Sequence, residues 1–348
     1  MRVAITGASG NVGTALIRYL RGSSQVDEIV GICRRPPQRD DPHWADVHWV
    51  AADVATDDLT PHLRGADAVV HLAWLIQPSH RPDVLQRVNV TGSRRVFRAA
   101  IDAAVPTIVH ASSVGVYSAG PKERLVDETW PRDGVPTSEY SRDKAHVESI
   151  LDTIEADHPQ VRVVRLRPGL IFQHAAGSEI VRYFIGRFVP ARLMRPGLLP
   201  VLPLPRGLAF QAVHVDDVAA AYHAAIVDLD ARGAFNIAAG PVLDAERLGA
   251  IFGTRVLPVP PGLVRALAEL SWRLHLQPTD PGWLDLAMLS PLLDCGRAAT
   301  ELSWQPRHDS VHAVRELLAG IQEHAGGGTP VLAPLPSLPV RLIGVDRS

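Results

Sequence analysis

Residues 1–13 read MRVAITGASGNVG, and this stretch decides the fold. An apolar run at residues 3–5 is typical of a strand buried on both faces, and the apolar positions that restart at Val12 have helical spacing. Between them three glycines follow a G-x-x-G-x-x-G pattern. A strand, a glycine turn and a helix in this order direct backbone N–H groups and the positive end of the helix at a phosphate. The stretch predicts a dinucleotide-binding βαβ unit whose cofactor contacts are Gly7, Gly10, Asn11, Val12 and Gly13.

The composition limits the classes of protein to consider. The chain has 348 residues, of which 46% are hydrophobic and 21% charged, with a formal net charge of −2. We expect one large or two fused domains and no binding of nucleic acid or an anionic membrane. The two cysteines, Cys33 and Cys295, predict neither a disulfide framework nor a metal site. The early first strand and the lack of a long uncharged apolar run predict a cytoplasmic protein.

Further apolar runs alternate with segments of helical periodicity. The expected strands cover residues 28–33, 47–50, 67–73, 107–113 and 161–166, and the expected helices include residues 85–104 and 143–156. This alternation predicts an α/β fold with a doubly wound parallel sheet and helices on both faces. From about residue 170 to 210 the alternation fails, and this proline-rich stretch indicates substrate-side structure rather than sheet core.

The end of the second strand is where a dinucleotide-binding fold contacts the adenosine ribose. An acidic residue there would bind both ribose hydroxyls, whereas a basic residue would pair with a 2′-phosphate. Arg34 and Arg35 occupy this place and favour NADP over NAD as the cofactor. The alternative is a ribose contact from Asp40 or Asp41.

The ends of two more strands face the expected cofactor. Asp53 and Val54 follow the third strand, where a carboxylate can accept a hydrogen bond from the adenine amino group. Leu72 and Ala73 close the fourth strand and are expected beside the cofactor ribose. Trp74 follows them, and it either lines the nicotinamide pocket or packs in the core.

The segment YSRDK at residues 140–144 carries the expected chemistry. Tyr140 and Lys144 lie one helical turn apart on the same face. An ammonium beside a phenol lowers the phenol pKa from about 10, which would make Tyr140 an acid or base near neutrality. Ser113, at the end of the fifth strand, could hydrogen-bond a substrate carbonyl while Tyr140 transfers the proton. Lys144 could also hold the nicotinamide ribose, and the nicotinamide would exchange the hydride.

Together these motifs resemble the extended short-chain dehydrogenase/reductase family, also called the NAD-dependent epimerase/dehydratase family. The matching stretches are TGASGNVG (6–13), DV (53–54), HLA (71–73), NVTG (89–92), SSVGVY (112–117), YSRDK (140–144), RPG (167–169), HVDDVA (214–219), FNI (235–237) and LSWQPR (302–307). The resemblance implies catalytic roles for Ser113, Tyr140 and Lys144, and cofactor contacts from Tyr140, Lys144 and Pro168. It implies an oxidoreductase or epimerase that transfers hydride at a secondary alcohol or ketone of a sugar-like or other small carbonyl substrate.

The resemblance also implies a domain plan. A Rossmann-like NAD(P)-binding domain would cover residues 1–169, with strands that return to it around residues 212–240. A smaller C-terminal substrate-binding domain would occupy mainly residues 170–320. Residues 325–348 would form a loosely ordered Pro/Gly-rich tail. A homodimer is expected, with the helices over residues 85–104 and 143–156 in its interface.

Two positions depart from the family pattern. Phe210 and Gln211 stand where members that use nucleotide sugars carry an arginine for the diphosphate, and the double arginine after the second strand departs from the NAD-type pattern. Both departures weaken the interpretation as a nucleotide-sugar epimerase. The rival from another class is a non-catalytic NAD(P)-binding redox sensor, which should have no cleft open to a substrate.

Four other polar residues have structural interpretations that compete with functional ones. Asn89 is expected to buttress the helix that carries it rather than to contact substrate. His71 and His110 lie in apolar strands and are expected to be core histidines with satisfied hydrogen bonds. Asp216 in the HVDD stretch is expected to be a helix N-cap rather than a metal ligand.

Overall fold

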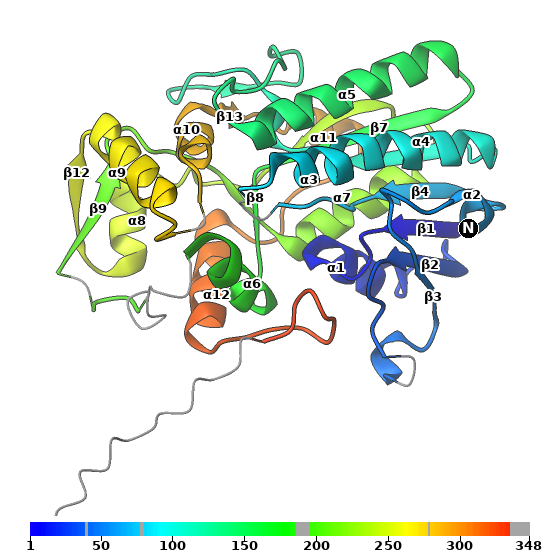
Figure 1. Cartoon of the computed structure of the whole chain (residues 1–348), viewed down its shortest axis with the longest axis horizontal. Helices are drawn as coiled ribbons and strands as arrows, with labels where there is room; N and C mark the ends of the chain where they lie inside the picture. Colours follow the sequence, from blue (N-terminus) through cyan, green and yellow to red (C-terminus); the bar gives the residue numbers. More distant parts are fainter. Residues whose placement is uncertain (39–40, 77–79, 186–194, 199, 278, 335–348) are drawn as a thin grey trace, which may run out of the picture.

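The computed structural model describes residues 1–38, 41–76, 80–185, 195–198, 200–277 and 279–334. Within them, seven strands form a central sheet in the spatial order β11-β7-β5-β4-β1-β2-β3, and every neighbouring pair is parallel (Figure 1). The strands are β1 (Arg2–Thr6), β2 (Glu28–Cys33), β3 (Val47–Ala51), β4 (Ala68–His71), β5 (Thr107–Ala111), β7 (Arg162–Pro168) and β11 (Gly233–Ile237). The prediction of a doubly wound parallel sheet is confirmed.

Helices cover both faces of the sheet because its central strands are apolar on both sides. Val3 and Ile5 of β1 belong to a core shared with α1 (Asn11–Leu20) and α7 (Val215–Val227). Ala4 belongs to the opposite core, shared with α2 (Thr60–Leu63), α4 (Gly92–Asp102) and α5 (Glu139–Asp157). The strand order reverses between β1 and β4. Ligands of open α/β sheets bind at such a switch point, outside the carboxyl ends of the strands.

Two expected helices have different boundaries in the structure. The segment expected as one helix over residues 85–104 consists of α3 (Pro82–Gln86), a π-helical turn, η2 (Arg87–Thr91), and α4. The helix expected from residue 143 begins at Glu139, where the Ser138 side chain accepts a hydrogen bond from the backbone N–H of Ser141. The apolar periodicity starts only after this polar first turn, whereas the capping serine marks the true start.

The C-terminal half builds a second lobe beside the sheet (Figure 1). Its small parallel pairs are β8 (Leu170–Phe172) with β10 (Ala212–His214), β9 (Val201–Pro205) with β12 (Arg255–Val259), and β6 (Leu125–Val126) with β13 (Leu292–Leu293). Its helices are α6 (Gly177–Ile180), α8 (Ala245–Phe252), α9 (Pro261–Arg273), α10 (Pro281–Leu289), α11 (Gly296–Glu301) and α12 (Ser310–Gln322). Short helical turns complete the chain: η1 (Pro42–Trp44), η3 (Val114–Val116), η4 (His174–Ala176) and η5 (Val181–Ile185).

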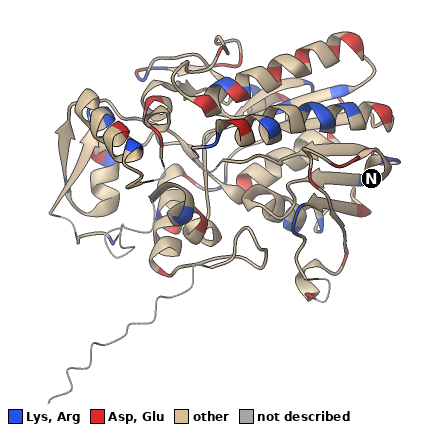
Figure 2. Ribbon diagram, viewed as in Figure 1, with Lys and Arg blue, Asp and Glu red and all other residues tan. Residues whose placement is uncertain are grey.

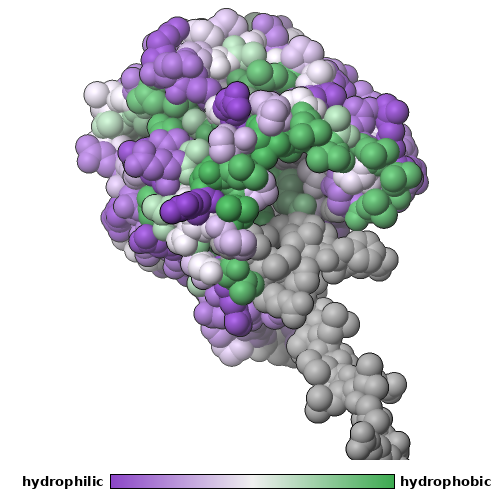
Figure 3. Space-filling view, turned by 90° about the vertical axis from the view of Figure 1, so that its left-hand side faces the viewer, coloured by the Kyte–Doolittle hydropathy of each residue, from purple (hydrophilic) through white to green (hydrophobic). Residues whose placement is uncertain are grey.

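The surface is mixed in charge and apolar in one region. Lysine, arginine and acidic residues are interspersed along α4 and α5 (Figure 2). Apolar side chains gather on the face of the C-terminal lobe that Figure 3 presents. On α9 and the turn after it the exposed leucines are Leu263, Leu267, Leu270, Leu274 and Leu276. No helix among the described residues has the length and apolarity needed to cross a membrane.

The start of the expected tail is packed rather than loose. Thr329 and Leu332 are each only 2% exposed, and the Thr329 hydroxyl donates to the backbone carbonyl of Ser9 at 2.7 Å. Arg182 donates to the backbone carbonyls of Val331 and Ala333. The segment that follows α12 is therefore fixed against the glycine loop of β1, and residues 335–348 lie outside the described part.

The residue that caps α7 is not Asp216, which the HVDD stretch predicts as the N-cap. The N-cap is His214, whose side chain accepts from the backbone N–H of Asp216. Asp216 lies in the first turn and pairs with Arg18 of α1 at 2.7 Å. Asp217 is 2% exposed and accepts from the backbone N–H groups of Arg307 and His308. The buried carboxylate, not the exposed one, ties α7 to the chain that leads into α12.

Replacing Asp217 with Ala should lower the free energy of unfolding by about 2–3 kcal/mol, because two backbone donors lose a charged acceptor. Chemical denaturation measures this loss. The matched control is Asp216→Ala, which removes an exposed ion pair and should cost less than about 1 kcal/mol. Equal losses for the two variants would contradict the anchoring role of Asp217.

Candidate active site

The glycine loop leaves room for a ligand by bringing backbone against backbone. Gly7 has φ +74°, and a Cβ there would lie 2.6 Å from the backbone nitrogen of Ala73. A Cβ on Gly13 would lie 2.6 Å from the carbonyl oxygen of Gly7. Gly10 is the N-cap of α1 and provides no side-chain acceptor, so the first turn of the helix keeps N–H groups for an anion. These residues fit a dinucleotide pyrophosphate.

The neighbouring predicted contacts lie around this loop. Asn11 begins α1, and its side-chain oxygen accepts a hydrogen bond from Gln173. Val12 packs against the core beneath the loop. Leu72 donates its backbone N–H to the carbonyl of Thr6 at 3.0 Å, which holds the chain after β4 beside β1.

The residues after β2 and β3 are those predicted to contact the adenosine half of the cofactor. Arg34 and Arg35 are exposed directly after β2. Asp41 accepts from the backbone N–H of His43 in the cap of η1, and Asp40 lies outside the described residues. Asp53 accepts from the backbone N–H of Ala55 at 2.9 Å, so one of its oxygens serves a local turn.

Two of the three predicted catalytic side chains meet directly. Ser113 caps η3 at the end of β5, where its Oγ accepts from the backbone N–H of Gly115 at 3.0 Å. The Ser113 Oγ lies beside Tyr140 at Gly115 and acts to lower the pKa of the phenol. A Cβ on Gly115 would lie 2.8 Å from the Tyr140 ring, so only glycine leaves room for this contact. Lys144 is 3% exposed, and its Nζ donates to the carbonyl of Ala111 at 2.7 Å.

The expected effect of Lys144 on Tyr140 is absent from this arrangement. Burial raises the pKa of Tyr140 to about 12, and only the hydrogen bond with Ser113 opposes it. Burial also lowers the pKa of Lys144 to about 7. The ammonium lies 5.7 Å from the centroid of the Tyr140 ring and is directed at the Ala111 carbonyl instead. Lys144 is not among the groups that shift the pKa of Tyr140 in this arrangement, and its effect on the phenol stays a prediction.

Aromatic rings surround Tyr140 and Lys144. The Lys144 ammonium lies 3.4 Å from the centroid of the Trp74 ring, which makes a cation–π contact. Trp74 also meets Tyr140 edge-on at 6.0 Å between centroids. On the other side Trp283 of α10 lies 4.9 Å from Tyr140, and Phe184 lies 5.0 Å from Trp283. Trp74 thus contacts both predicted catalytic residues of α5.

A small cavity lies beside Tyr140. Its volume is about 20 Å³, and it is lined by Leu75, Ile76, Leu85, Asn89, Glu139, Tyr140, Asp143, Asp280 and Trp283. A larger hollow of about 870 Å³ lies between β9, α8 and β12, but none of the predicted site residues lines it. Of the two, the smaller cavity is the one lined by a predicted site residue, Tyr140, together with three carboxylates.

Several polar residues near the site have structural partners. Asn89 accepts from the backbone N–H of Leu75 at 2.7 Å and donates to its carbonyl, so it holds the chain after β4. His71 lies between the hydroxyls of Thr6 and Ser93, at 2.7 and 2.8 Å. His110 differs from the expectation, because neither ring nitrogen has a hydrogen-bond partner in the described part of the chain. Burial lowers its pKa and keeps it neutral.

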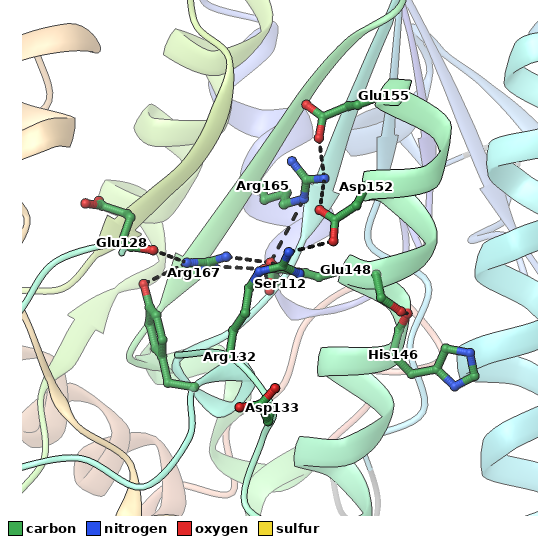
Figure 4. A network of polar contacts seen from close by, with 12 residues as sticks. Ser112, Glu128, Arg132, Asp133, His146, Glu148, Asp152, Glu155, Arg165 and Arg167 are labelled. Carbon is green, nitrogen blue, oxygen red and sulfur yellow. Dashed lines mark hydrogen bonds and ion pairs between the residues drawn. The ribbon is translucent and has the colours of Figure 1, made fainter. Parts of the chain in front are cut away.

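A buried polar network holds α5, the helix of Tyr140 and Lys144, on the sheet (Figure 4). Glu148 is completely buried and accepts two hydrogen bonds from Arg167 of β7, at 2.9 and 2.5 Å. Ser112 donates to the same carboxylate at 2.5 Å. Arg167 also donates to the Tyr117 hydroxyl at 3.0 Å. Burial acts to raise the pKa of Glu148, but the bonds and charge of Arg167 outweigh it, and the net pKa is lowered.

The network extends toward the surface through a second arginine. Arg165 pairs with Asp152 at 3.1 Å and Glu155 at 2.5 Å, and Arg132 pairs with Asp152 at 2.5 Å. These pairs join α5, β7 and the loop before α5 (Figure 4). The positions of Ser113 and Tyr140 relative to each other therefore depend on one continuous set of ionic contacts.

The comparison with known proteins decides the family. The model of the NAD dependent epimerase/dehydratase family matches residues 3–238. The chain belongs to this family.

Relatives within and around the family have several activities. The chain is 26% identical over 353 residues to an uncharacterized protein of Mycobacterium tuberculosis, a match that covers 99% of this chain and 32% of that protein. It is 30% identical over 212 residues to an L-arabinose 1-dehydrogenase (NAD(P)(+)) of Haloferax volcanii, covering 56% of this chain and 78% of that one. It is 36% identical over 109 residues to a decarboxylating sterol-4-alpha-carboxylate 3-dehydrogenase of Saccharomyces cerevisiae, covering 31% and 30%.

Solved structures share the fold. A UDP-glucose 4-epimerase of Thermus thermophilus in complex with NAD superposes with a TM-score of 0.66 at 21% identity, covering 92% of this chain and 99% of that one. At this level of identity the likeness shows only that the two chains share a fold, a Rossmann-like sheet with a second lobe.

Three side chains near Tyr140 and Lys144 are not predicted from the sequence: Trp283, Glu148 and Asp143. Trp283 comes from α10, far along the chain, and no local pattern connects it to Tyr140. Glu148 had a signal, because a carboxylate one turn beyond Lys144 lies on the same helix face. Asp143 had a weaker one, since it follows Tyr140 by three residues within the motif. Each gains its role only from what the fold places opposite it.

Replacing Glu148 with Gln should lower the free energy of unfolding by about 3–5 kcal/mol, because it leaves Arg167 buried without its counter-charge. Chemical denaturation measures the change. Glu155→Gln in the same helix is the control, since that side chain is 35% exposed and its pair should contribute less than about 1 kcal/mol. A loss below that value for Glu148→Gln would contradict the central role of the pair.

Proposed function

We propose that the chain is an NAD(P)-dependent oxidoreductase acting at a secondary alcohol or its ketone, with Ser113, Tyr140 and Lys144 as its catalytic residues. One observation carries this proposal: Ser113, at the carboxyl end of β5, lies beside Tyr140, which lines a cavity with aromatic and acidic walls. A hydroxyl pair at the topological switch point can bind one carbonyl oxygen from two sides. Membership of an NAD-dependent family supports the same class of reaction.

The proposed cofactor site follows the edge of the sheet. Gly7, Gly10 and Gly13, with Asn11 and Val12, would hold the pyrophosphate. When bound, the nicotinamide dinucleotide supplies or accepts the hydride. The remaining proposed contacts are Arg34, Asp53 and Val54 at the adenosine end, and Leu72, Ala73, Tyr140, Lys144 and Pro168 toward the nicotinamide. Arg34 favours a 2′-phosphate and hence NADP.

The protonation of Tyr140 suits the reductive direction. With its pKa raised to about 12 by burial, the phenol keeps its proton at neutral pH and can donate it to a carbonyl oxygen. Ser113 accepts from the Gly115 N–H, which fixes its hydroxyl toward Tyr140. Ser113 then orients the carbonyl and Tyr140 delivers the proton as the carbon gains hydride.

The substrate we propose is not a nucleotide sugar. Gln211, at the place of the diphosphate-binding arginine, instead bonds the backbone of Leu293 through both ends of its amide, at 3.1 and 2.6 Å. The cavity beside Tyr140 has aromatic, aliphatic and acidic walls. A sugar-like or other small carbonyl compound without a diphosphate is chemically compatible with these walls, and relatives named as an L-arabinose dehydrogenase and a sterol carboxylate dehydrogenase support this class.

A second candidate is a non-catalytic NAD(P)-binding redox regulator. The observation that favours it is the size of the cavity, about 20 Å³, together with the Trp74 ring on Lys144. A regulator would bind the cofactor yet turn over no alcohol or ketone. The variant described next separates the two candidates.

Tyr140→Phe should reduce turnover of a carbonyl panel by roughly two to four orders of magnitude, because the proton donor is lost, while cofactor affinity stays nearly the same. Oxidation of NADPH or NADH measures turnover, and titration of cofactor fluorescence measures affinity. Tyr19→Phe, on α1 against His223, is the control and should be as active as the parent. Unchanged turnover in Tyr140→Phe would end the catalytic assignment, and cofactor binding without any turnover in the parent would favour the regulator.

Arg34→Asp should shift the cofactor preference from NADPH toward NADH by roughly tenfold or more, because a charged hydrogen bond to the 2′-phosphate becomes a repulsion. The ratio of the two cofactor affinities measures the shift. Arg94→Asp on the exposed face of α4 carries the same charge change at a distance and should leave the ratio alone. No shift in Arg34→Asp would reject the 2′-phosphate interpretation.

A further inference from the structure

The cavity beside Tyr140 has an acidic wall. Glu139, Asp143 and Asp280 line it together with the rings of Tyr140 and Trp283. Its volume of about 20 Å³ suits one group of the size of a water molecule or an ammonium. A polar group of a ligand could enter here next to the Tyr140 hydroxyl.

Asp143 is the residue of this wall without a structural task. Its side chain is more than nine-tenths buried, with 9% exposed. Its Oδ2 is buried and has no hydrogen-bond partner in the described part of the chain. A buried carboxylate oxygen that lacks a donor destabilises the protein, and such an orphan in a native site calls for a partner. Because Asp143 lines the cavity, the missing donor would come from a ligand.

The other two carboxylates differ from Asp143 in their partners. Asp280 caps α10 by accepting from the backbone N–H of Gly282 at 2.8 Å. Glu139 lies in the first turn of α5, and its pKa is raised by burial and then by the charges of Asp143 and Asp280. The charges of both other carboxylates therefore reach Glu139. Only Asp143 keeps a buried oxygen for direct binding.

Two cations act on this wall without pairing with it, since the charges of Arg142 and Lys144 lower the pKa of Asp143. None of the three carboxylates forms an ion pair within the described residues. Arg142 is exposed and donates to the Pro136 carbonyl. Lys144 is directed at the Ala111 carbonyl and the Trp74 ring. Burial raises the pKa of Asp143 to about 6, so the carboxyl is still mostly ionised at neutral pH.

Building on the proposed oxidoreductase function, we propose that the substrate is an amino alcohol or amino ketone whose ammonium binds Asp143 in this cavity. Asp143 lies three residues after Tyr140, so the two side chains are neighbours on one face of α5. The ammonium must therefore lie close to the reacting carbon. The Tyr140 and Trp283 rings add cation–π attraction to the carboxylate charge. A neutral hydroxyl could donate to Asp143, but it would gain nothing from the rings or the other carboxylates.

The test compares phenylethanolamine with phenyl glycol, which differ only in an amino group for a terminal hydroxyl. Calorimetric titration of the full chain, with NADH or NADPH present so that the alcohols cannot be oxidised, should show the amine binding at least about tenfold more tightly. In Asp143→Asn this preference should disappear. Asp157→Asn, an exposed residue at the end of the same helix, is the matched control and should keep it.

Equal affinities in the parent, no binding of the amine at millimolar concentration, or an intact preference in Asp143→Asn would each overturn the inference. The parent comparison needs no variant, so it decides the matter even where Asp143→Asn fails to fold. Binding is measured without turnover, so a failure of the catalytic proposal appears separately, as unchanged turnover in Tyr140→Phe. Turnover of neutral ketones with no amine preference would reject this inference alone.

Discussion

The geometry of the site depends on the buried pair of Glu148 and Arg167. Glu148 lies on α5 one turn beyond Lys144, and Arg167 lies at the end of β7. Ser112, which donates to the same carboxylate, directly precedes Ser113. One carboxylate therefore positions α5 relative to both β7 and the end of β5. A buried pair is stable only when its remaining hydrogen-bonding capacity is satisfied, and Tyr117 supplies this for Arg167.

A second constraint acts on the other side of the switch point, where backbone packs directly against backbone. Gly7 and Gly13 let β1, the chain after β4 and the start of α1 approach within distances that no Cβ allows. The Thr6–His71 hydrogen bond reinforces this junction from within the sheet, at 2.7 Å. Close backbone packing at Gly7 and Gly13 therefore fixes the expected cofactor side of the site. The Glu148–Arg167 network fixes the side that carries Tyr140 and Lys144. Both meet at the carboxyl ends of β4 and β5.

The sequence predicted what depends on local pattern. Apolar runs located the central strands because each is buried on both faces, and the glycine spacing located the loop after β1. The apolar periodicity predicts a start of α5 at Asp143, four residues too late, because the first turn is polar. Only the capping residue, Ser138, indicates the true start. The N-cap of α7 was assigned to Asp216, although His214 takes that role and Asp216 pairs with Arg18 instead. Capping depends on the backbone conformation before the helix, which residue type alone does not fix.

The site residues show the same limit more sharply. Their spacing on α5 follows from helix geometry, so Tyr140 and Lys144 could be placed on one face from sequence. The protonation states of these two residues could not be predicted, because they depend on side chains and backbone groups from other helices and strands. Carboxylates lie on both sides of Lys144 in sequence, at Asp143 and Glu148, yet burial against Trp74 and the Ala111 carbonyl lowers its pKa to about 7. Glu148 is neutralised by an arginine from β7, whereas Asp143 faces a cavity.

Two carboxylates of one helix, Asp143 and Glu148, therefore have opposite consequences. Arg167 converts Glu148 into a structural anchor by supplying both a counter-charge and donors. Arg142 and Lys144 lower the pKa of Asp143 by their charge alone, and one Asp143 oxygen has no donor among the described residues in the cavity that Tyr140 also lines. A negative potential disfavours a developing phenolate and favours a positive group on the substrate. The raised pKa of Tyr140, whose main cause is burial, points to a phenol that holds its proton until a substrate arrives.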